Sequence, residues 1–236
     1  GLHQRLGEFE AVAEAATRCG RELIDVRHPR QRFATGTGVR RPGKRLLTVG
    51  TDCSCGKKYT ALALEREMRR RGWNADFRAT GQTGIMIAGD GVAVDAVVAD
   101  FISGAVEALA PANAPDHWDV IEGQGSLFHP AFAGVSLGLL HGAQPDILVL
   151  CHEPTRRHMR GLPEQKLPSI ADCIELNLRC AALTNPGVRL VGLSINTAFL
   201  PPAERAGYLE RVAAEFRLPA VDPLTTGVGP IVDRLA

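Results

Sequence analysis

Short apolar runs alternate with amphipathic segments along most of the chain after residue 44. Residues 147–150 are continuously apolar and 46–49 nearly so, as expected of strands buried on both faces of a parallel sheet. Between these runs, Ala61, Leu64 and Met68 recur at helical spacing. The pattern predicts strands at 46–49, 75–79, 118–121, 146–150, 189–195 and 220–221, and helices at 57–71, 95–109, 169–183, 202–216 and 228–235.

This alternation of strands with helices predicts an α/β fold. Strands that are separated by helices pair in parallel, and the connecting helices then cover both faces of the sheet. We therefore expect a mainly parallel sheet with helices on both faces, in the three-layer arrangement of P-loop NTPase-like proteins. Ser169 followed by Asp172 marks the start of one helix, because a serine side chain at this position caps the first turn.

The first 44 residues have a different pattern. Residues 6–19 have one apolar face and predict a helix, and residues 21–27 predict a strand. The basic, glycine-containing stretch 28–44 is typical of a linker, so we place a domain boundary there. The chain begins with Gly1 and not with Met, so we expect a processed chain or a piece of a longer protein.

Composition excludes several classes of protein. Apolar residues make up 45% and charged residues 22%, which excludes long disordered regions. The net charge of +1 gives no basic field for nucleic acid or an anionic membrane, and no apolar run approaches the roughly 20 residues of a membrane span. The six cysteines lack the spacing of a secreted disulfide framework, so we expect a reducing cytoplasm.

A glycine-containing turn connects the strand 46–49 to the helix that follows it. Backbone N–H groups of such a turn and of the helix N-terminus converge on a concavity that suits phosphate, and Lys57 adds a positive charge. The alternative is a plain turn followed by a solvated lysine. We expect phosphate binding by Gly50, Thr51, Asp52, Cys53, Ser54, Cys55, Gly56, Lys57, Lys58 and Tyr59.

Two departures from the plain P-loop pattern bear on the ligand. Five residues instead of four separate Gly50 from Gly56, and Lys58 stands where a Ser or Thr hydroxyl would bind Mg²⁺. Since Lys58 has the same charge sign as that ion, a metal-free polyphosphate such as the diphosphate of coenzyme A is favoured. Cys53 and Cys55 lack the spacing and the second ligand pair of a zinc site, so no metal is predicted.

Residues 50–57 resemble the phosphate loop of dethiobiotin synthetase, and residues 118–126 resemble the strand-end Glu-Gly-x-Gly segment of the same superfamily. A larger part of the chain is similar to a narrower group, the D-glutamate N-acetyltransferase-like family, long known only as a P-loop domain of unknown function. The segments that carry this resemblance are 1–3, 50–53, 79–85, 94–101, 122–126 and 154–161, which together span almost the whole chain.

The resemblance implies acetyl transfer from acetyl-CoA to the amino group of a D-amino acid, with D-glutamate as the leading candidate. Similar family members carry an N-terminal Rossmann-like domain. We therefore expect residues 1–40 to be the tail of that domain with its linker, and 41–236 to be the P-loop domain. The alternatives are an ATP- and Mg²⁺-dependent ligase or NTPase resembling dethiobiotin synthetase, and a non-catalytic nucleotide-sensing module.

Acetyl transfer to an amine requires a general base and donors for the developing oxyanion. Open α/β sheets bind ligands at the carboxyl ends of their strands, where Asp52, Glu122, His129 and His152 are the candidate catalytic groups. Glu122 is followed by a glycine that permits close approach of a ligand. Each histidine has a structural role as its alternative. Asn196 also follows a strand, at a position where nucleotide-binding relatives contact a base. Adenine contact is the hypothesis for it, and a turn-forming asparagine is the alternative.

An acidic substrate requires cations or hydrogen-bond donors. Arg156, Arg157 and Arg160 form a basic cluster after the strand 146–150, which is either a carboxylate site or a solvated surface. Gln82 and Thr83 follow the strand 75–79 and can donate to a carboxylate or to the acetyl oxygen. We expect a small-molecule substrate, no nucleic-acid or membrane partner, and assembly into a homo-oligomer.

Overall fold

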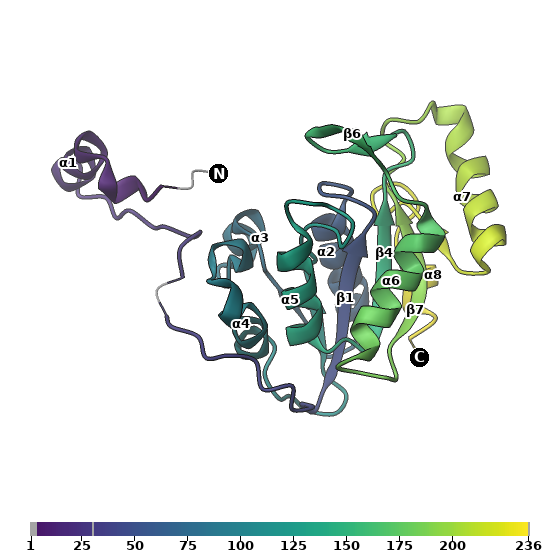
Figure 1. Ribbon diagram of the computed structural model, residues 1–236, viewed down its shortest axis with the longest axis horizontal. Helices are drawn as coiled ribbons and strands as arrows, with labels where there is room; N and C mark the ends of the chain where they lie inside the picture. Colours follow the sequence, from purple (N-terminus) through teal and green to yellow (C-terminus); the bar gives the residue numbers. More distant parts are fainter. Residues whose placement is uncertain (1–3, 30, 236) are drawn as a thin grey trace.

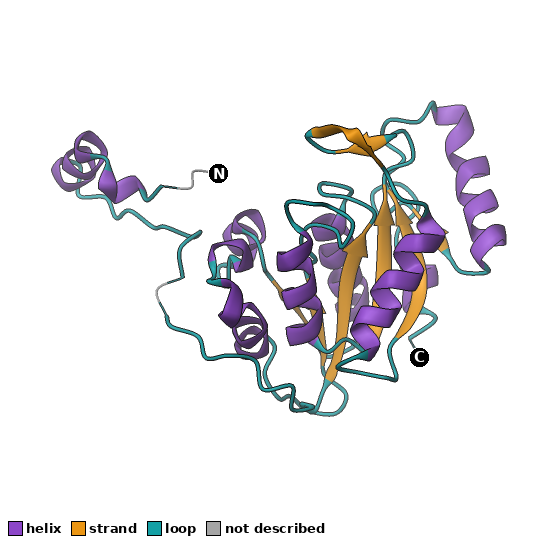
Figure 2. Ribbon diagram, viewed as in Figure 1, coloured by secondary structure: helices purple, strands orange, loops and turns teal. Residues whose placement is uncertain are grey.

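The computed structural model describes residues 4–29 and 31–235 (Figure 1). Within these residues, six strands form one parallel sheet, which Figure 2 shows between layers of helices. In spatial order the strands are β2 (Ala75–Arg78), β3 (Trp118–Ile121), β1 (Lys44–Gly50), β4 (Ile147–His152), β7 (Arg189–Ile195) and β8 (Ala220–Val221). The predicted α/β fold, with its parallel sheet and helices on both faces, is confirmed.

The central strands β1 and β4 are buried on both faces, which explains their nearly continuous apolar sequence. Leu46 and Val149 pack into one apolar cluster, while Leu47 and Leu148 pack into a second. Successive side chains of a strand point to opposite faces, so the two clusters lie on opposite sides of the sheet. Each face therefore requires its own layer of helices.

Helices of both layers bury their apolar stripes against the sheet. On one face lie α2 (Lys57–Arg70) and the short α8 (Gly229–Val232), and the predicted stripe of Ala61, Leu64 and Met68 is fully buried there. The opposite face is covered by α4 (Ile102–Leu109), α5 (Ala133–Ala143) and α6 (Ile170–Ala182). Further along the chain, α7 (Pro202–Phe216) packs beside β8.

The predicted start of α6 is also confirmed. The Ser169 hydroxyl accepts a hydrogen bond from the Asp172 backbone N–H at 3.0 Å, and it donates to the Asp172 carboxylate at 2.6 Å. This cap satisfies one of the N–H groups that the first turn of a helix leaves without a partner. The local sequence therefore fixes where α6 begins.

Other predictions for individual elements were wrong. Residues 21–27 form no strand within the described chain, because no neighbouring strand pairs with them and the backbone bends from residue 26 on. The helix expected at 95–109 begins only at Ile102, after two 3-10 turns, η2 (Val94–Ala96) and η3 (Ala99–Phe101). The elements that the pattern did not predict are α3 (Gln82–Ala88), α5, and the hairpin of β5 (His158–Met159) and β6 (Leu162–Lys166).

Residues before β1 form an extended arm. The 3-10 turn η1 (Leu6–Glu8) and helix α1 (Glu10–Arg18) stand apart from the sheet in Figure 1. The chain then returns to the body, where the Thr37 and Gly38 N–H groups each donate to Glu107 of α4 at 3.0 Å. The domain division at residues 40 and 41 stays a prediction. Residues 1–3 of the family resemblance lie outside the described residues.

Among the described residues, no helix is both long enough and apolar enough to cross a membrane. The apolar residues of the longest helices are instead confined to stripes that face the sheet, as in α2.

Candidate active site

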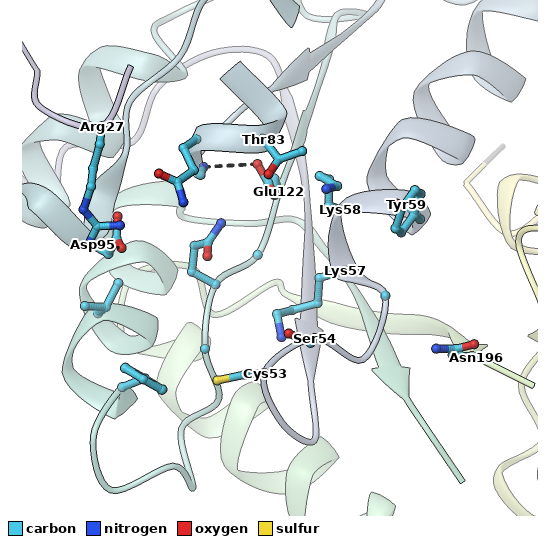
Figure 3. Close-up of a pocket in the computed structure, with 18 residues that line it drawn as sticks. Arg27, Cys53, Ser54, Lys57, Lys58, Tyr59, Thr83, Asp95, Glu122 and Asn196 are labelled. Atoms are coloured by element: carbon cyan, nitrogen blue, oxygen red, sulfur yellow. Dashed lines mark hydrogen bonds and ion pairs between the residues drawn. The ribbon is translucent and has the colours of Figure 1, made fainter. Parts of the chain in front are cut away.

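A pocket of about 530 Å³ lies at the carboxyl ends of β1, β2 and β3 (Figure 3). The carboxyl edge is where open parallel sheets bind their ligands. The pocket brings together residues from the glycine loop, from the start of α3 and from the segment after β3. The predicted site residues that line it are Cys53, Ser54, Gly56, Lys57, Lys58, Tyr59, Gln82, Thr83, Glu122 and Asn196.

The glycine loop has the geometry of an anion cradle. Ser54 and Gly56 adopt positive φ angles of 52° and 111°, which turn the backbone sharply before α2 begins at Lys57. Within the described structure no side chain caps this helix, so its first N–H groups are available to a ligand. The Lys57 ammonium donates to the Asp52 carbonyl at 2.7 Å, which positions its charge under the loop. Backbone N–H groups and a buried cation thus converge on one wall of the pocket.

Lys58 stands at the position where a P-loop usually carries the hydroxyl that binds Mg²⁺, and Thr60 is the first threonine or serine after it. Lys58 lines the pocket, and its ammonium lies 4.9 Å from the centre of the Tyr59 ring. Thr60 is fully buried, where its hydroxyl lies 3.0 Å from the Gly56 carbonyl and 2.7 Å from the Ser194 hydroxyl. Neither residue supplies a hydroxyl ligand to the pocket. The wall beside the loop is therefore cationic.

Asp52 connects the glycine loop to the β5–β6 hairpin and to the segment before it. Its carboxylate accepts hydrogen bonds from the Arg156 guanidinium at 2.7 Å and from the Arg160 N–H at 2.8 Å. Arg156 also donates to the Cys53 carbonyl at 2.5 Å. Asp52 is fully buried and does not line the pocket. We assign it and Arg156 to ordering the loop.

The basic cluster of Arg156, Arg157 and Arg160 lies outside the pocket, although its predicted role was to bind a substrate carboxylate there. The side chains of Arg157 and Arg160 are exposed, and Arg156 is committed to the loop. In the described chain, none of the three lines the pocket. Their contact with a substrate stays a prediction that this geometry does not favour.

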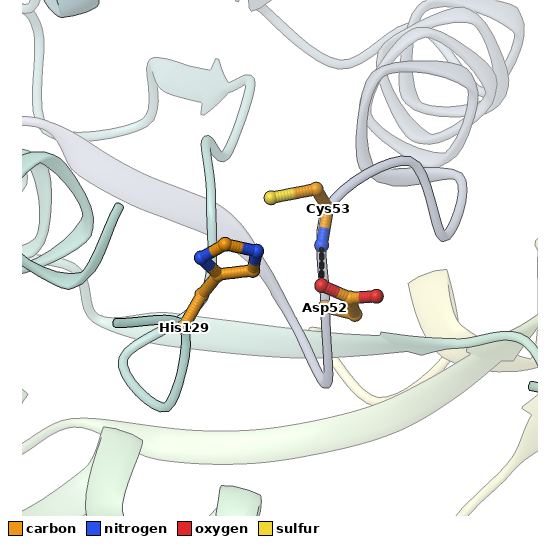
Figure 4. A group of neighbouring side chains, drawn as sticks. All are labelled: Asp52, Cys53 and His129. Carbon is orange, nitrogen blue, oxygen red and sulfur yellow. Dashed lines mark hydrogen bonds between the residues drawn. The ribbon is translucent and has the colours of Figure 1, made fainter. Parts of the chain in front are cut away.

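Figure 4 shows Asp52, Cys53 and His129 as neighbours, with potential metal-ligand atoms within 4.8 Å of one another. His129 is already engaged at both ring nitrogens: Nδ1 accepts from the Ala131 N–H at 3.2 Å, and Nε2 lies 3.2 Å from the Arg160 carbonyl. Nε2 therefore carries the proton in the neutral ring. Since the Asp52 carboxylate is bound to Arg156, the group has few free donor atoms for an ion. His129 also has no free lone pair for base catalysis.

His152 is buried at the end of β4, outside the pocket. Its Nδ1 lies 3.0 Å from the Thr51 hydroxyl, and burial lowers the pKa of the imidazole to about 4. The ring is therefore neutral near pH 7. It orders the first residues of the glycine loop, and its predicted catalytic role has no support from its position.

Among the four candidate catalytic groups, Glu122 is the one that lines the pocket. It follows β3 and is 4% exposed, and its Oε2 accepts from the Thr80 N–H at 3.1 Å and the Gly81 N–H at 3.2 Å. Burial raises the pKa of this carboxyl above its ordinary value of 4.5, although these two N–H groups and the nearby lysines oppose the rise. Among the residues that the structure describes, Oε1 has no hydrogen-bond partner. One oxygen is thus fixed and the other is available to a ligand.

Gly84 shows how closely α3 approaches this carboxylate. A Cβ atom at position 84 would overlap the Glu122 Oε2, so only glycine lets the helix pack there. The Thr80 hydroxyl donates to the Glu122 carbonyl at 2.6 Å and accepts from the Gln124 amide at 3.1 Å. These contacts hold Glu122 and the first turn of α3 in one arrangement.

Some pocket residues were missed by the sequence analysis. Arg27 comes from the arm and pairs with Asp95 of η2 at 2.7 Å. No local motif marks either residue, because they meet only when the arm folds back on the body. The other missed side chains in the lining are Gln124, Phe132 and Val135.

Gly123 gives a direct test of this architecture. Its N–H donates to the Thr48 hydroxyl at 2.9 Å, and a Cβ atom there would overlap the Thr48 carbonyl oxygen. We expect Gly123→Ala to lower the free energy of unfolding by about 3 kcal/mol, since the two backbones cannot separate without disturbing β1 and β3. Thermal unfolding should then shift down by about 6–12 °C.

Gly134→Ala is the matched control for this change. Gly134 is exposed near the start of α5, and a Cβ atom there would meet nothing within 4 Å. Alanine favours helix by up to about 1 kcal/mol over glycine, so this variant should unfold at the same temperature or slightly higher. Equal midpoints for Gly123→Ala and the unsubstituted chain would contradict the packing described here.

The fold and the loop define the class of this chain: a P-loop α/β domain. Residues 32–232 match the family described as "Domain of unknown function (DUF1611_C) P-loop domain". The chain belongs to this family.

Comparisons with individual proteins agree. The chain is 55% identical over 235 residues to a protein from Pseudoalteromonas sp. named "D-glutamate N-acetyltransferase", covering all of this chain and 71% of the relative. A protein of the same name from Tritonibacter scottomollicae is 52% identical over 236 residues, with the same coverage. A crystal structure of a DUF1611 family protein from Anabaena variabilis superposes with a TM-score of 0.91 at 36% identity, covering 100% of this chain and 69% of that one. Over its whole length the chain is thus similar to proteins named as N-acetyltransferases, and it spans 71% of their length.

Proposed function

We propose that this protein transfers the acetyl group of acetyl-CoA to the amino group of D-glutamate. The observation that carries the proposal is the placement of Glu122, a buried carboxylate with a raised pKa, in the same pocket as the cations of the glycine loop. The name of the two relatives, at 55% and 52% identity, supplies the reaction and its substrate. The pocket supplies the groups that such a reaction requires.

The loop fits the diphosphate of coenzyme A. The uncapped N-terminus of α2 offers backbone donors, and Lys57 and Lys58 offer two positive charges on the same wall. A diphosphate without a metal ion carries charges that two lysines can neutralise. Asn196 lines the same pocket. Its side-chain Oδ1 accepts from the Ala198 N–H at 3.2 Å, which leaves the side-chain NH₂ group for the proposed contact with adenine.

Glu122 is the proposed general base. The amino nitrogen attacks the acetyl carbonyl carbon, a C–N bond forms, and Glu122 Oε1 takes the proton that the nitrogen loses. The C–S bond then breaks, and the proton passes to the coenzyme A thiolate. Gln82 and Thr83, at the start of α3, line the same pocket and can donate to the oxyanion that develops between these steps.

The ATP- and Mg²⁺-dependent alternative is less well supported. A ligase would require an oxygen ligand for the ion at position 58 or from a nearby carboxylate. Position 58 holds a lysine, and the Asp52 carboxylate is bound by Arg156 and the Arg160 N–H. Glu122 Oε1 is then the carboxylate oxygen that a ligase would have to use, and it lies in the same pocket as Lys57 and Lys58. A non-catalytic sensing module would not need a buried carboxylate with a free oxygen in the pocket. These contacts favour metal-free acetyl transfer.

A turnover assay tests this proposal. The protein is mixed with acetyl-CoA and D-glutamate in excess chelator, coenzyme A release is followed with a thiol reagent, and the product is identified by mass spectrometry. We expect release that depends on D-glutamate and is unaffected by the chelator, with L-glutamate much less active. Release that requires Mg²⁺ and ATP, or no N-acetylated product, would contradict the proposal.

Cys53 offers a second, independent readout of where acetyl-CoA binds. Cys53 lines the pocket, and burial raises the pKa of its thiol, so we expect it to react slowly with iodoacetamide. At about 100 times its Kd, acetyl-CoA should slow alkylation of Cys53 about 100-fold, because little free protein remains. Cys19 is exposed on the arm and serves as the internal control. Peptide mass spectrometry that finds equal labelling of Cys53 with and without acetyl-CoA would place the ligand elsewhere.

A further inference from the structure

Arg27 is the pocket residue whose role the proposed reaction leaves open. It belongs to the arm, yet its side chain is only 12% exposed and lines the pocket. In Figure 3, Arg27 and Asp95 lie on the side away from Lys58 and Tyr59, with Glu122 between them in that view. An arginine from outside the sheet thus completes one wall of the site.

We propose that Arg27 selects the substrate by binding its side-chain carboxylate, and that Asp95 is the positioning residue for Arg27. This inference rests on the proposed function, because it assigns a residue to the acidic end of the amino acid that is acetylated. Arg27 would favour a D-amino acid whose side chain ends in a carboxylate over the analogue whose side chain ends in an uncharged amide.

The charges in the pocket support this assignment. In the described lining, the cationic side chains are Arg27, Lys57 and Lys58. Both lysines belong to the wall that is proposed to bind the coenzyme phosphates. Arg27 is therefore the cation left for a second anionic group, and a guanidinium binds carboxylates through two parallel hydrogen bonds.

The contacts of Arg27 leave such a bond possible. Asp95 engages the Nη2 atom at 2.7 Å, and within the described structure the other guanidinium nitrogens have no protein partner. A guanidinium has five donors, so one ion pair fixes its orientation without exhausting it. Asp95 is 41% exposed, which keeps this pair at the rim of the pocket and not in its core.

The arm presents Arg27 through a defined turn. The Asp25 carboxylate accepts from the Arg27 N–H at 3.2 Å and from the His28 N–H at 3.4 Å, and it also contacts the His28 ring at 2.9 Å. An aspartate that binds the backbone two residues further on stabilises a turn. The turn places the Arg27 side chain toward the body of the protein, where it meets Asp95.

The position of Glu122 decides which carboxylate Arg27 meets. The substrate amine must reach Glu122, and the α-carboxylate is attached to the same carbon as that amine. Figure 3 shows Arg27 set back from Glu122 beside Asp95. A guanidinium in that place fits the carboxylate at the far end of the substrate side chain.

The experiment compares Arg27→Gln, Arg27→Lys and Asp95→Asn with the unsubstituted protein, using D-glutamate and D-glutamine. We expect Arg27→Gln to raise the KM for D-glutamate about 10- to 100-fold, since a charged hydrogen-bond pair is lost. The KM for acetyl-CoA and the activity with D-glutamine should stay within about 2-fold. Arg27→Lys should retain part of the affinity, and Asp95→Asn should raise the same KM by less while leaving kcat unchanged.

Arg32→Gln is the matched control, because Arg32 is an exposed arginine of the same arm. It should leave all constants unchanged. An unchanged KM for D-glutamate in Arg27→Gln, or an equal loss with both amino acids, would overturn the assignment. Calorimetric titration of each variant with D-glutamate alone gives a second readout. If the unsubstituted protein shows no turnover, the proposed function is contradicted. If Arg27→Gln binds D-glutamate as tightly as the unsubstituted protein does, only the role of Arg27 is contradicted.

Discussion

Replacing Glu122 by glutamine is expected to lower kcat by about 10²- to 10⁴-fold, the usual contribution of a general base. The amide oxygen of E122Q can still accept from the Thr80 and Gly81 N–H groups, so the pocket keeps its shape. The KM for acetyl-CoA should change little, because the coenzyme phosphates are proposed to bind the glycine loop. Steady-state kinetics with each substrate varied in turn measure both constants.

The pH profile tests the same role. The base must be ionised, so kcat/KM should fall as the pH drops through the pKa of Glu122, which burial raises above 4.5. The acidic limb should therefore lie above the range of an ordinary glutamate and should be missing from the residual activity of E122Q. An acidic limb that persists unchanged in E122Q would assign it to another group.

The stability of E122Q provides the control for folding. A folded-state pKa above the unfolded value means that the carboxyl stabilises the fold most when it is protonated, and that this contribution is lost as the pH rises through the folded pKa. The neutral amide avoids that loss. We expect thermal unfolding of E122Q at pH 7 to be at or above that of the unsubstituted protein. A much lower midpoint would mean that lost activity reflects misfolding.

The second large effect is expected at Lys57. Lys57 is 6% exposed and its ammonium is held against the Asp52 carbonyl at 2.7 Å, so it meets a phosphate with little further reorganisation. We expect Lys57→Ala to weaken acetyl-CoA binding by about 2–3 kcal/mol, which is about 30- to 150-fold in Kd. Calorimetric titration measures this change directly.

Lys44→Ala is the matched control for Lys57. Lys44 lies at the opposite end of β1, where its ammonium is 5.2 Å from the Trp118 ring centre. Removing it costs at most about 1 kcal/mol of stability and should leave the Kd for acetyl-CoA unchanged. Equal Kd values for Lys57→Ala and Lys44→Ala would show that the glycine loop does not bind the coenzyme.

Much of the fold was predictable because buried strands and helices have recognisable patterns of apolar residues. The strands around residues 46–49 and 147–150 are apolar on both faces, and the α2 stripe of Ala61, Leu64 and Met68 has helical spacing. The glycine loop was predictable because Gly50 and Gly56 stand between a strand and a helix, and Gly56 tolerates the positive φ of 111° that the turn requires. Local sequence predicts these features, although Arg156 and His152 also order the glycine loop through contacts that are distant in sequence.

Other features depend on contacts that are distant in sequence. Helix α5 was missed because its sequence is apolar or small on most sides, with glycines at 134, 138 and 142, so no stripe stands out. The glycine at 142 packs against Ser103 of α4, a contact that only the folded chain reveals. Residues 21–27 have the composition of a strand but find no partner in the described sheet.

The candidate site was predicted only in part, for the same reason. Glu122, Gln82 and Thr83 were found because they follow strands, and strand ends meet at one edge of a parallel sheet. The predicted substrate contact of the arginine cluster is not favoured, because the spacing of charges does not show which carboxylate an arginine will bind. In the folded chain Arg156 binds Asp52. Arg27 and Asp95 come together only across a turn of the arm, which no periodicity indicates.

Calorimetric titration of the protein with acetyl-CoA in excess chelator, set beside titration with ATP and Mg²⁺, tests the central claim most directly. The account predicts binding of acetyl-CoA that the chelator does not change, and weaker binding of ATP with or without the ion. Saturable binding of ATP that is lost in chelator, with no heat from acetyl-CoA, would contradict it.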